Sequence, residues 1–306
     1  MFKNSIVALL ACVMILGGAA TAGAATIVIV NLDGPGEGFN DTTPATPVGG
    51  NPGTTIGQQR LNVFQEAADI WGSLLPSDVT IRVEARFDAQ FCDASSAVLG
   101  SAGPIEIFRD FAGAEVPGTW YHVALANRLA GSDLSPSDND ISATFNSAID
   151  NNNSCLDGTN WYYGFDGNEG TDIELLPVVL HELGHGLGFS TLVGSSGSEF
   201  LGFPDLYETF IFDNTTGLHW DDMSNGQRAA SAVNTDNVVW DGDVSTAFAP
   251  NFLSGSPIMF VNSPPALPSS FPIGTATFGP PVDEPGVTGD VVLVDDGTGT
   301  TSDGCE

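Results

Sequence analysis

Basic residues are almost missing from this chain. Seven lysines and arginines face 38 aspartates and glutamates, so the formal net charge at pH 7 is −31. Such a charge repels phosphate backbones and anionic lipid headgroups, which argues against nucleic acid and acidic membranes as partners. The single lysine is Lys3, so a chain that begins near Ala25 loses one positive charge and carries −32. We therefore expect a soluble, acidic protein.

Long apolar runs are scarce as well. The clearest one, Ile6–Leu16, follows Lys3 and is too short to span a bilayer. Ala22-Gly23-Ala24 then supplies the small residues of a cleavage site, which predicts a signal peptide over residues 1–24 and a mature chain that begins near Ala25. We expect a secreted, extracellular protein with no membrane partner after signal removal.

Cysteine is rare, with four in the chain, and Cys12 lies inside the predicted signal peptide. Since exported proteins can keep disulfides, we predict a bond between Cys92 and Cys155, both of which precede the histidine-rich segment described next. Cys305 then stays single. Its partner would lie beyond the given sequence, unless it is a free thiol or the pairing is different.

Histidine is equally rare, yet two of the four histidines stand together in His181-Glu182-Leu183-Gly184-His185. On a helix, positions i and i+4 share a face, so both imidazoles can reach one metal ion. Zinc prefers such ligands, and a catalytic zinc keeps one position for water. Glu182 is placed to accept the proton of that water. The spacing predicts a zinc hydrolase with metal ligands His181 and His185, general base Glu182, and peptide hydrolysis without a covalent intermediate.

The remaining patterns predict an α+β fold. β-branched residues indicate a strand over residues 26–31, and strict alternation indicates a half-buried strand from Val79 to Phe87. Between them, a helix is expected to start at a Thr55–Gln58 capping box and to end at Pro76. Its expected buried stripe is Leu61, Phe64, Ala68, Trp71 and Leu75.

Other segments are less decided. Trp120–Leu129 fits a strand or a helix, and His122 within it is interpreted as structural. Trp161-Tyr162-Tyr163 indicates core or strand. The metal-binding helix starts either at a Thr171–Glu174 capping box or with Pro177 in its first turn. Gly186 and Gly188 favour a sharp exit from this helix.

The segment His181–Thr191 reads HELGHGLGFST and resembles the metzincin class of zinc metalloproteases, whose motif is HExxHxxGxxH or HExxHxxGxxD. Gly188 stands at the turn position behind the site. Thr191 stands at the third-ligand position and is a poor zinc ligand, so the third donor must come from elsewhere. The GLGFS ending most resembles the leishmanolysin-like branch, where an insertion separates the helix from the third histidine.

Over most of residues 26–306, the chain is similar to secreted bacterial HELGHGLGF proteins that carry an inserted protease-associated domain. Phe278-Gly279-Pro280 and Gly289–Gly297 carry this part of the resemblance. It implies a catalytic domain over residues 25–254, the start of the inserted domain over 255–306, and a third ligand and methionine turn beyond Glu306. Alternatives within the chain are a turn or strand at Met259 and a third ligand at His219 or, more weakly, at Asp205, Glu208 or Asp213.

In metzincins the substrate lies antiparallel to an edge strand, and the resemblance implies Ile141–Phe145 as that edge, an ordinary sheet strand being the alternative. The acidic clusters Asp133–Asp140 and Asp295–Asp303 suggest calcium or solvated loops. The predicted function is a secreted zinc endopeptidase acting on protein or peptide substrates. A zinc hydrolase of other substrates and a non-catalytic zinc- or peptide-binding module are the alternatives.

Overall fold

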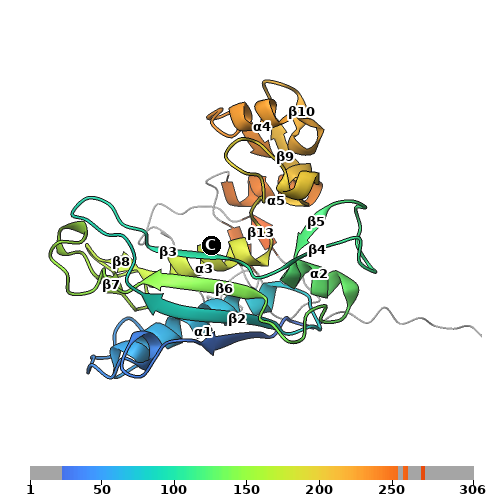
Figure 1. Cartoon of the computed structure of the whole chain (residues 1–306). Coiled ribbons are helices and arrows are strands. Elements are labelled where there is room, and N and C mark those ends of the chain that lie inside the picture. The colour runs from blue at the N-terminus through green and yellow to red at the C-terminus, as the bar shows by residue number, and fades with distance from the viewer. Residues whose placement is uncertain (1–22, 254–257, 261–269, 273–306) are drawn as a thin grey trace, which may run out of the picture. The chain divides into compact units, whose positions relative to one another are not determined.

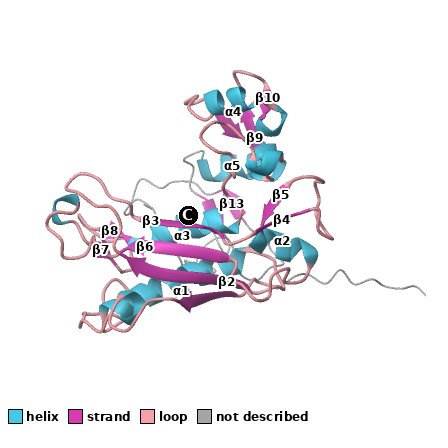
Figure 2. Cartoon of the chain, in the orientation of Figure 1, coloured by secondary structure: helices cyan, strands magenta, loops and turns pink. Residues whose placement is uncertain are grey.

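The computed structural model describes residues 23–253, 258–260 and 270–272, and it confirms the predicted α+β class (Figures 1 and 2). The α-helices are α1 (Ile56–Leu74), α2 (Val123–Ala130), α3 (Leu175–Leu187), α4 (Asn225–Ser231) and α5 (Asp243–Leu253). The strands are β1 (Ile27–Asn31), β2 (Ile81–Asp88), β3 (Gly100–Pro104), β4 (Ile107–Arg109), β5 (Trp120–His122), β6 (Ile141–Asn146), β7 (Trp161–Tyr162), β8 (Ile173–Glu174), β9 (Ile211–Asp213), β10 (Leu218–His219), β11 (Val238–Trp240), β12 (Ile258–Phe260) and β13 (Ser270–Pro272). Among these described helices, none is both long and apolar enough to cross a membrane.

The described residues divide into two compact units. The first comprises those within Met1–Leu192 and Phe200–Tyr207, and the second those within Val193–Glu199 and Glu208–Glu306. The domain boundary predicted after residue 254 falls at the undescribed segment 254–257 and stays a prediction. Outside the described residues lie Phe278–Pro280, Gly289–Gly297, Asp295–Asp303 and Cys305.

A mixed sheet in the order β1-β2-β6-β3 organises the first unit. β1 pairs with β2 and β2 with β6 in parallel, whereas β3 runs antiparallel to β6. β2 was expected from Val79 and begins at Ile81, and its alternation is real: Ile81, Val83, Ala85 and Phe87 are buried. α1 lies against β1, α3 lies against β3 and β6, and the two helices contact each other (Figure 1).

Helix α1 begins where its cap was predicted. The Thr55 side chain accepts a hydrogen bond from the Gln58 backbone N–H at 3.2 Å, which satisfies one of the free donors at the helix start. The predicted buried stripe was correct at Phe64 and Ala68 but wrong at Leu61, which is exposed. The buried face also includes Gln59, Arg60, Val63 and Ala67. Polar residues on this face explain the error, because hydrophobic periodicity cannot detect them.

Arg60 is buried because partners satisfy its guanidinium. It donates hydrogen bonds to the Tyr163 hydroxyl at 2.9 Å and to the Asp150 carboxylate at 2.8 Å, and it lies over the Phe87 ring. Burial is the largest cause that raises the pKa of Tyr163, which keeps this phenol protonated. Trp161 and Tyr163 are core residues and Trp161–Tyr162 forms β7, as the aromatic cluster predicted.

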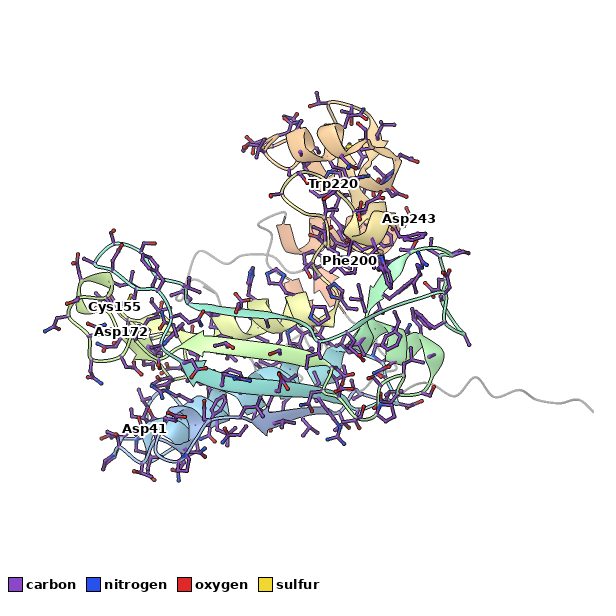
Figure 3. The ribbon with its side chains drawn as sticks, in the orientation of Figure 1. Asp41, Cys155, Asp172, Phe200, Trp220 and Asp243 are labelled. Atoms are coloured by element: carbon purple, nitrogen blue, oxygen red, sulfur yellow. A yellow bond between two sulfur atoms is a disulfide. The ribbon has the colours of Figure 1, made fainter. Side chains whose placement is uncertain are left out.

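The ambiguous segment after residue 119 contains both predicted structures, strand β5 followed at once by helix α2. Trp120 also ties residues 200–207 to the rest of the first unit. Its indole donates to the Phe200 carbonyl at 3.0 Å, and its backbone N–H donates to the Pro204 carbonyl at 2.9 Å. The Phe200 ring, labelled in Figure 3, packs edge-on against the Trp120 ring.

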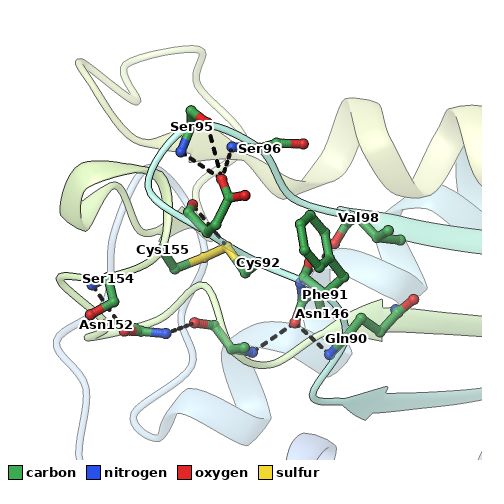
Figure 4. The surroundings of a disulfide bond; sticks show 12 residues. Gln90, Phe91, Cys92, Ser95, Ser96, Val98, Asn146, Asn152, Ser154 and Cys155 are labelled. Carbon is green, nitrogen blue, oxygen red and sulfur yellow. Dashed lines mark hydrogen bonds between the residues drawn. A yellow bond between two sulfur atoms is a disulfide. The ribbon is translucent and has the colours of Figure 1, made fainter.

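The predicted disulfide is confirmed, since the structure joins Cys92 and Cys155 with their Cα atoms 5.2 Å apart (Figure 4). Cys155 is fully buried, and Asn146 nearby donates to the Phe91 and Val98 carbonyls. The bond therefore holds the β2–β3 connection onto the segment that follows β6.

Removing this disulfide is expected to lower the free energy of unfolding by about 2–5 kcal/mol. The two cysteines stand 63 positions apart in the sequence. The bond thus closes a long loop, and its loss frees much entropy in the unfolded chain. Denaturant unfolding of a Cys92→Ala/Cys155→Ala variant would measure this, with Ser154→Ala, at an exposed residue next to Cys155, as the control that should unfold like the parent. Equal stability of the double variant would show that the bond does not constrain the fold.

The second unit is organised around Arg228, which is buried although it is charged. On α4, it donates to the carbonyls of Gly197, Trp220 and Met223 and pairs with Glu199 at 2.9 Å. A Ser224–Gln227 capping box starts this helix. Around it, β9 pairs antiparallel with both β10 and β11.

Candidate active site

Helix α3 carries the HExxH motif. It begins at Leu175, with Glu174 as N-cap and no side-chain cap, so the Thr171–Glu174 capping box was wrong. Pro177 lies in the first turn, where a missing N–H costs no intrahelical hydrogen bond, as the alternative start predicted. The Trp71 indole of α1 donates to the Leu180 carbonyl at 3.1 Å, directly before the first motif histidine. α3 is therefore anchored at the residue where the site begins.

The structural role of Gly186 differs from the predicted one. It does not end α3, because the helix continues to Leu187 and Gly188 is the C-cap, with φ at 123°. A Cβ atom on Gly186 would lie 2.4 Å from the Ile141 Cγ2 atom of β6. Glycine is required here because the helix backbone passes directly against a fully buried isoleucine.

Substituting Gly186 with alanine is therefore expected to destabilise the protein by about 1–3 kcal/mol through overpacking. Gly184→Ala in the same helix is the matched control. Its Cβ would lie 3.6 Å from the Trp71 ring, an ordinary contact. The higher helix propensity of alanine should therefore leave this control neutral or stabilising. Thermal melts of both variants measure the difference. If Gly186→Ala has the same melting temperature as the parent, α3 and β6 are not packed this closely.

The two motif histidines converge. The Nε2 atoms of His181 and His185 lie 3.1 Å apart, and the rings meet edge to face. Two nitrogens bound to one tetrahedral zinc at about 2.0–2.1 Å would lie roughly 3.3 Å apart, so this donor pair fits a shared zinc ion. His181 is exposed and His185 is half-buried, which leaves both open to a ligand from solvent.

The His185 ring is fixed by its other nitrogen. Nδ1–H donates to the Phe189 carbonyl at 2.9 Å, which leaves the Nε2 lone pair for a metal. The His185 carbonyl in turn accepts from the buried His122 Nδ1–H at 3.1 Å. Burial lowers the pKa of His122, which favours the neutral ring. His122 is thus structural, as expected, and it anchors the end of α3.

Glu182 faces strand β3. Its Oε2 atom accepts a hydrogen bond from the Ala102 backbone N–H at 3.1 Å, so this strand orients the carboxylate beside the histidine pair. The predicted edge strand was wrong. Ile141–Asn146 (β6) lies between β2 and β3, and Gly100–Pro104 (β3) is the outer strand of this sheet on the α3 side. The sequence GSAGP has no alternating apolar residues, so the pattern could not detect it.

The third metal ligand stays unassigned. Thr191, at the third-ligand position that the metzincin resemblance implies, donates through its hydroxyl to the Asp205 carboxylate at 2.8 Å, and the Leu192 backbone N–H donates to the same oxygen. Asp205 is buried and thus occupied in shaping the exit from α3. Within the described ranges, no three His, Cys, Asp or Glu side chains are grouped so that they could hold a metal ion.

The other candidates belong to the second unit, where the structure gives each a local partner. His219 Nε2 lies 2.8 Å from the Asp241 carboxylate, and Glu208 is buried 4.0 Å from Arg228. Met259 lies on β12, paired with Phe271, so it is a strand residue, which was the expected alternative to a methionine turn. His219 as an in-chain ligand stays a prediction.

Asp213 is a structural carboxylate. Its hydrogen bonds with Ser231, with Asn234 and with the backbone N–H groups of Thr215 and Thr216 lower its pKa to about 2. A carboxylate with a depressed folded pKa stabilises the protein above the unfolded pKa of about 3.9, and this stabilisation is lost as the pH falls through the folded value. Asp213 therefore holds the turn after β9 in its charged form.

Asp213→Asn is expected to lower the melting temperature at pH 7, and the difference from the parent should shrink between about pH 5 and pH 2. Melting curves over that range measure it. Asp236→Asn, which makes the same chemical change at an exposed aspartate of the same unit, is the matched control and should melt like the parent at pH 7. A difference for Asp213→Asn that persists in full at the acid end of this range would contradict the assignment.

Hydrogen bonds account for the first acidic cluster. Asp140 is buried and accepts from the Arg82 backbone N–H and the Asn127 amide, and burial raises its pKa. Asp133 accepts from the Ser135 backbone N–H, and Asp138 accepts from two serine hydroxyls. These carboxylates shape the loop between α2 and β6. Calcium binding at this loop stays a prediction.

The structure therefore brings together the three motif residues that the sequence identified, His181, Glu182 and His185. It adds three contacts that no local pattern reveals: Ala102 N–H on Glu182, the Phe189 carbonyl on the His185 ring, and His122 on the His185 carbonyl. When the chain was compared with protein-family models, with curated proteins and with solved structures, no match was found.

Proposed function

We propose that this chain is a secreted, metzincin-like zinc endopeptidase that acts on protein or peptide substrates. The observation that carries the proposal is the convergence of two imidazole Nε2 atoms to 3.1 Å on the open face of α3. The Glu182 carboxylate stands next to the first of these histidines in the chain, oriented by the Ala102 N–H. Paired imidazoles with an adjacent carboxylate are the donor set and base of zinc-dependent hydrolysis.

The chain's own residues have distinct parts. His181 and His185 would hold the zinc, and the Phe189 carbonyl keeps the His185 ring in the tautomer that ligation needs. Zinc bound there supplies a Lewis acid that polarises the scissile carbonyl and lowers the pKa of a water to about 7. Glu182 accepts the proton of the attacking water and passes it to the leaving amine.

Strand β3 supports a peptide as the substrate. It is the outer strand of the mixed sheet and contacts α3. An extended peptide can therefore add backbone hydrogen bonds along the rest of this strand, next to the Ala102 N–H that Glu182 occupies. Its small residues, Gly100, Ser101, Ala102 and Gly103, leave room for the substrate's side chains.

Zinc content and hydrolysis of purified protein test the proposal. We expect bound zinc, cleavage of casein or gelatin, loss of cleavage with a chelator and recovery when zinc is added back. Hydrolysis of ester or simple amide substrates alone would favour a zinc hydrolase of other compounds. Zinc binding without any hydrolysis would favour a binding module, and failure to bind zinc would refute the proposal.

A further inference from the structure

The first described residues enter the fold at the C-terminal end of α1. The backbone N–H of Ala25 faces two carbonyl groups, Gly72 at 2.9 Å and Leu75 at 2.8 Å. Ala25 itself is buried, and the next residues lead directly into β1. Gly72 permits this approach, because a Cβ atom at that position would lie 2.5 Å from the Ala25 carbonyl oxygen.

The end of α1 lacks the groups that usually satisfy a helix C-terminus. The Gly72 carbonyl would accept from residue 76 in a continuing helix, but Pro76 has no N–H. The last turn of α1 contains no basic residue of its own that could balance the negative end of the helix dipole. Arg128 of α2 approaches this end and donates through Nε to the Pro76 carbonyl at 3.2 Å, a different carbonyl from those of Gly72 and Leu75. The carbonyls of Gly72 and Leu75 thus converge on the Ala25 nitrogen. As a peptide N–H, this nitrogen has only one hydrogen to share between them.

We infer that hydrolysis between Ala24 and Ala25 creates a cation at this position, and that the new α-ammonium group of Ala25 binds these two carbonyls. Water cleaves the peptide bond, Ala24 leaves as a carboxylate, and the Ala25 nitrogen becomes an ammonium group. That group has three hydrogens, enough for the Gly72 and Leu75 carbonyls, and its charge complements the helix dipole. Processing of the predicted signal peptide would thus complete the fold as well as release the protein.

The proposed binding site of the Ala25 ammonium group is also connected to the candidate active site through side-chain and backbone contacts of α1. Gly72 follows Trp71, whose indole donates to the Leu180 carbonyl beside His181. The Leu75 N–H donates to the Trp71 carbonyl, so the same turn of α1 carries both connections. Cleavage removes two hydrogen bonds, one from the Gly23 N–H to the Asp78 carboxylate and one from the Ser77 N–H to the Gly23 carbonyl, and the ammonium contacts must outweigh both.

The lack of lysine makes the test direct. Beyond Lys3 the chain has no lysine, so a chain that starts at Ala25 has its α-amino group as its only primary amine. N-terminal sequencing of the secreted protein should begin at Ala25. An amine-acylating reagent should then label the folded Ala25–Glu306 chain at least about 10-fold more slowly than the same chain in denaturant. A chain that starts at Gly23 and carries Asp78→Asn, so that its amine has lost its carboxylate partner, should react without this protection.

Stability supplies a second readout. Below about pH 7.7, the Ala25 form should melt about 2–4 °C above an Nα-acetylated Ala25 form refolded after labelling. Because these contacts raise the folded pKa of the amine, the advantage should disappear as the pH rises through that value. A different N-terminus, unprotected labelling of the Ala25 form, or equal melting temperatures of the free and acetylated forms would overturn the inference. None of these readouts requires proteolytic activity, so the result is independent of the proposed function.

Discussion

Replacing Glu182 with glutamine is expected to lower kcat/KM for a peptide substrate by about 10²–10⁴-fold while zinc content and melting temperature stay unchanged. Glutamine has the same shape, and its amide oxygen can still accept the hydrogen bond from the Ala102 N–H. It cannot accept a proton from the attacking water. Glu182→Ala should also keep the zinc and lose hydrolysis, but it removes the contact with β3 as well.

Glu174→Gln is the matched control, because it makes the same chemical change at the N-cap of the same helix. It should leave kcat/KM unchanged, since Glu174 stands two turns before the base, at the other end of α3 from His185. Steady-state kinetics on one fluorogenic peptide, with metal analysis of each preparation, compares the two variants. Wild-type activity in Glu182→Gln would show that another group is the general base.

Local sequence patterns predicted those helices and strands whose buried residues recur at short, regular intervals. β2 alternates because one face of the strand packs into the core, and α1 starts at Thr55 because that side chain caps its helix. The same patterns failed where a side chain's role depends on a distant partner. Leu61 fits the helical stripe and is exposed, whereas Arg60 is buried by Tyr163 and Asp150, which stand 103 and 90 positions away along the chain.

The candidate site divides in the same way. His181, Glu182 and His185 were predictable because one helical turn brings them together regardless of the rest of the fold. The role of strand β3 was not predictable, because neither its sequence nor its spacing shows that it pairs with β6 and forms the edge of the sheet. Gly186 was interpreted as a helix end because a glycine's close contact, here with Ile141, becomes visible only in three dimensions.

Replacing His185 with alanine is expected to lower zinc affinity by more than about 100-fold, with loss of all hydrolysis. Removal of one imidazole leaves His181 as the only nitrogen donor of the pair, and a catalytic zinc needs three protein ligands. Equilibrium dialysis with zinc measures the affinity directly. His185 is half-buried and packs edge-on against His181, so its removal could disturb packing. Far-UV circular dichroism and a melting curve therefore check that the variant still folds.

His219→Ala tests whether this histidine is the third zinc ligand. If the imidazole of His219 serves only Asp241, 2.8 Å away, this variant should bind zinc as tightly as the parent. If it is the third ligand, its removal should weaken zinc binding as strongly as His185→Ala, because each ligand contributes to the same ion. Normal zinc affinity in His185→Ala would refute the proposed metal centre, whatever the result for His219→Ala. Loss of one of the two imidazoles on α3 must weaken the binding of any zinc ion that they share.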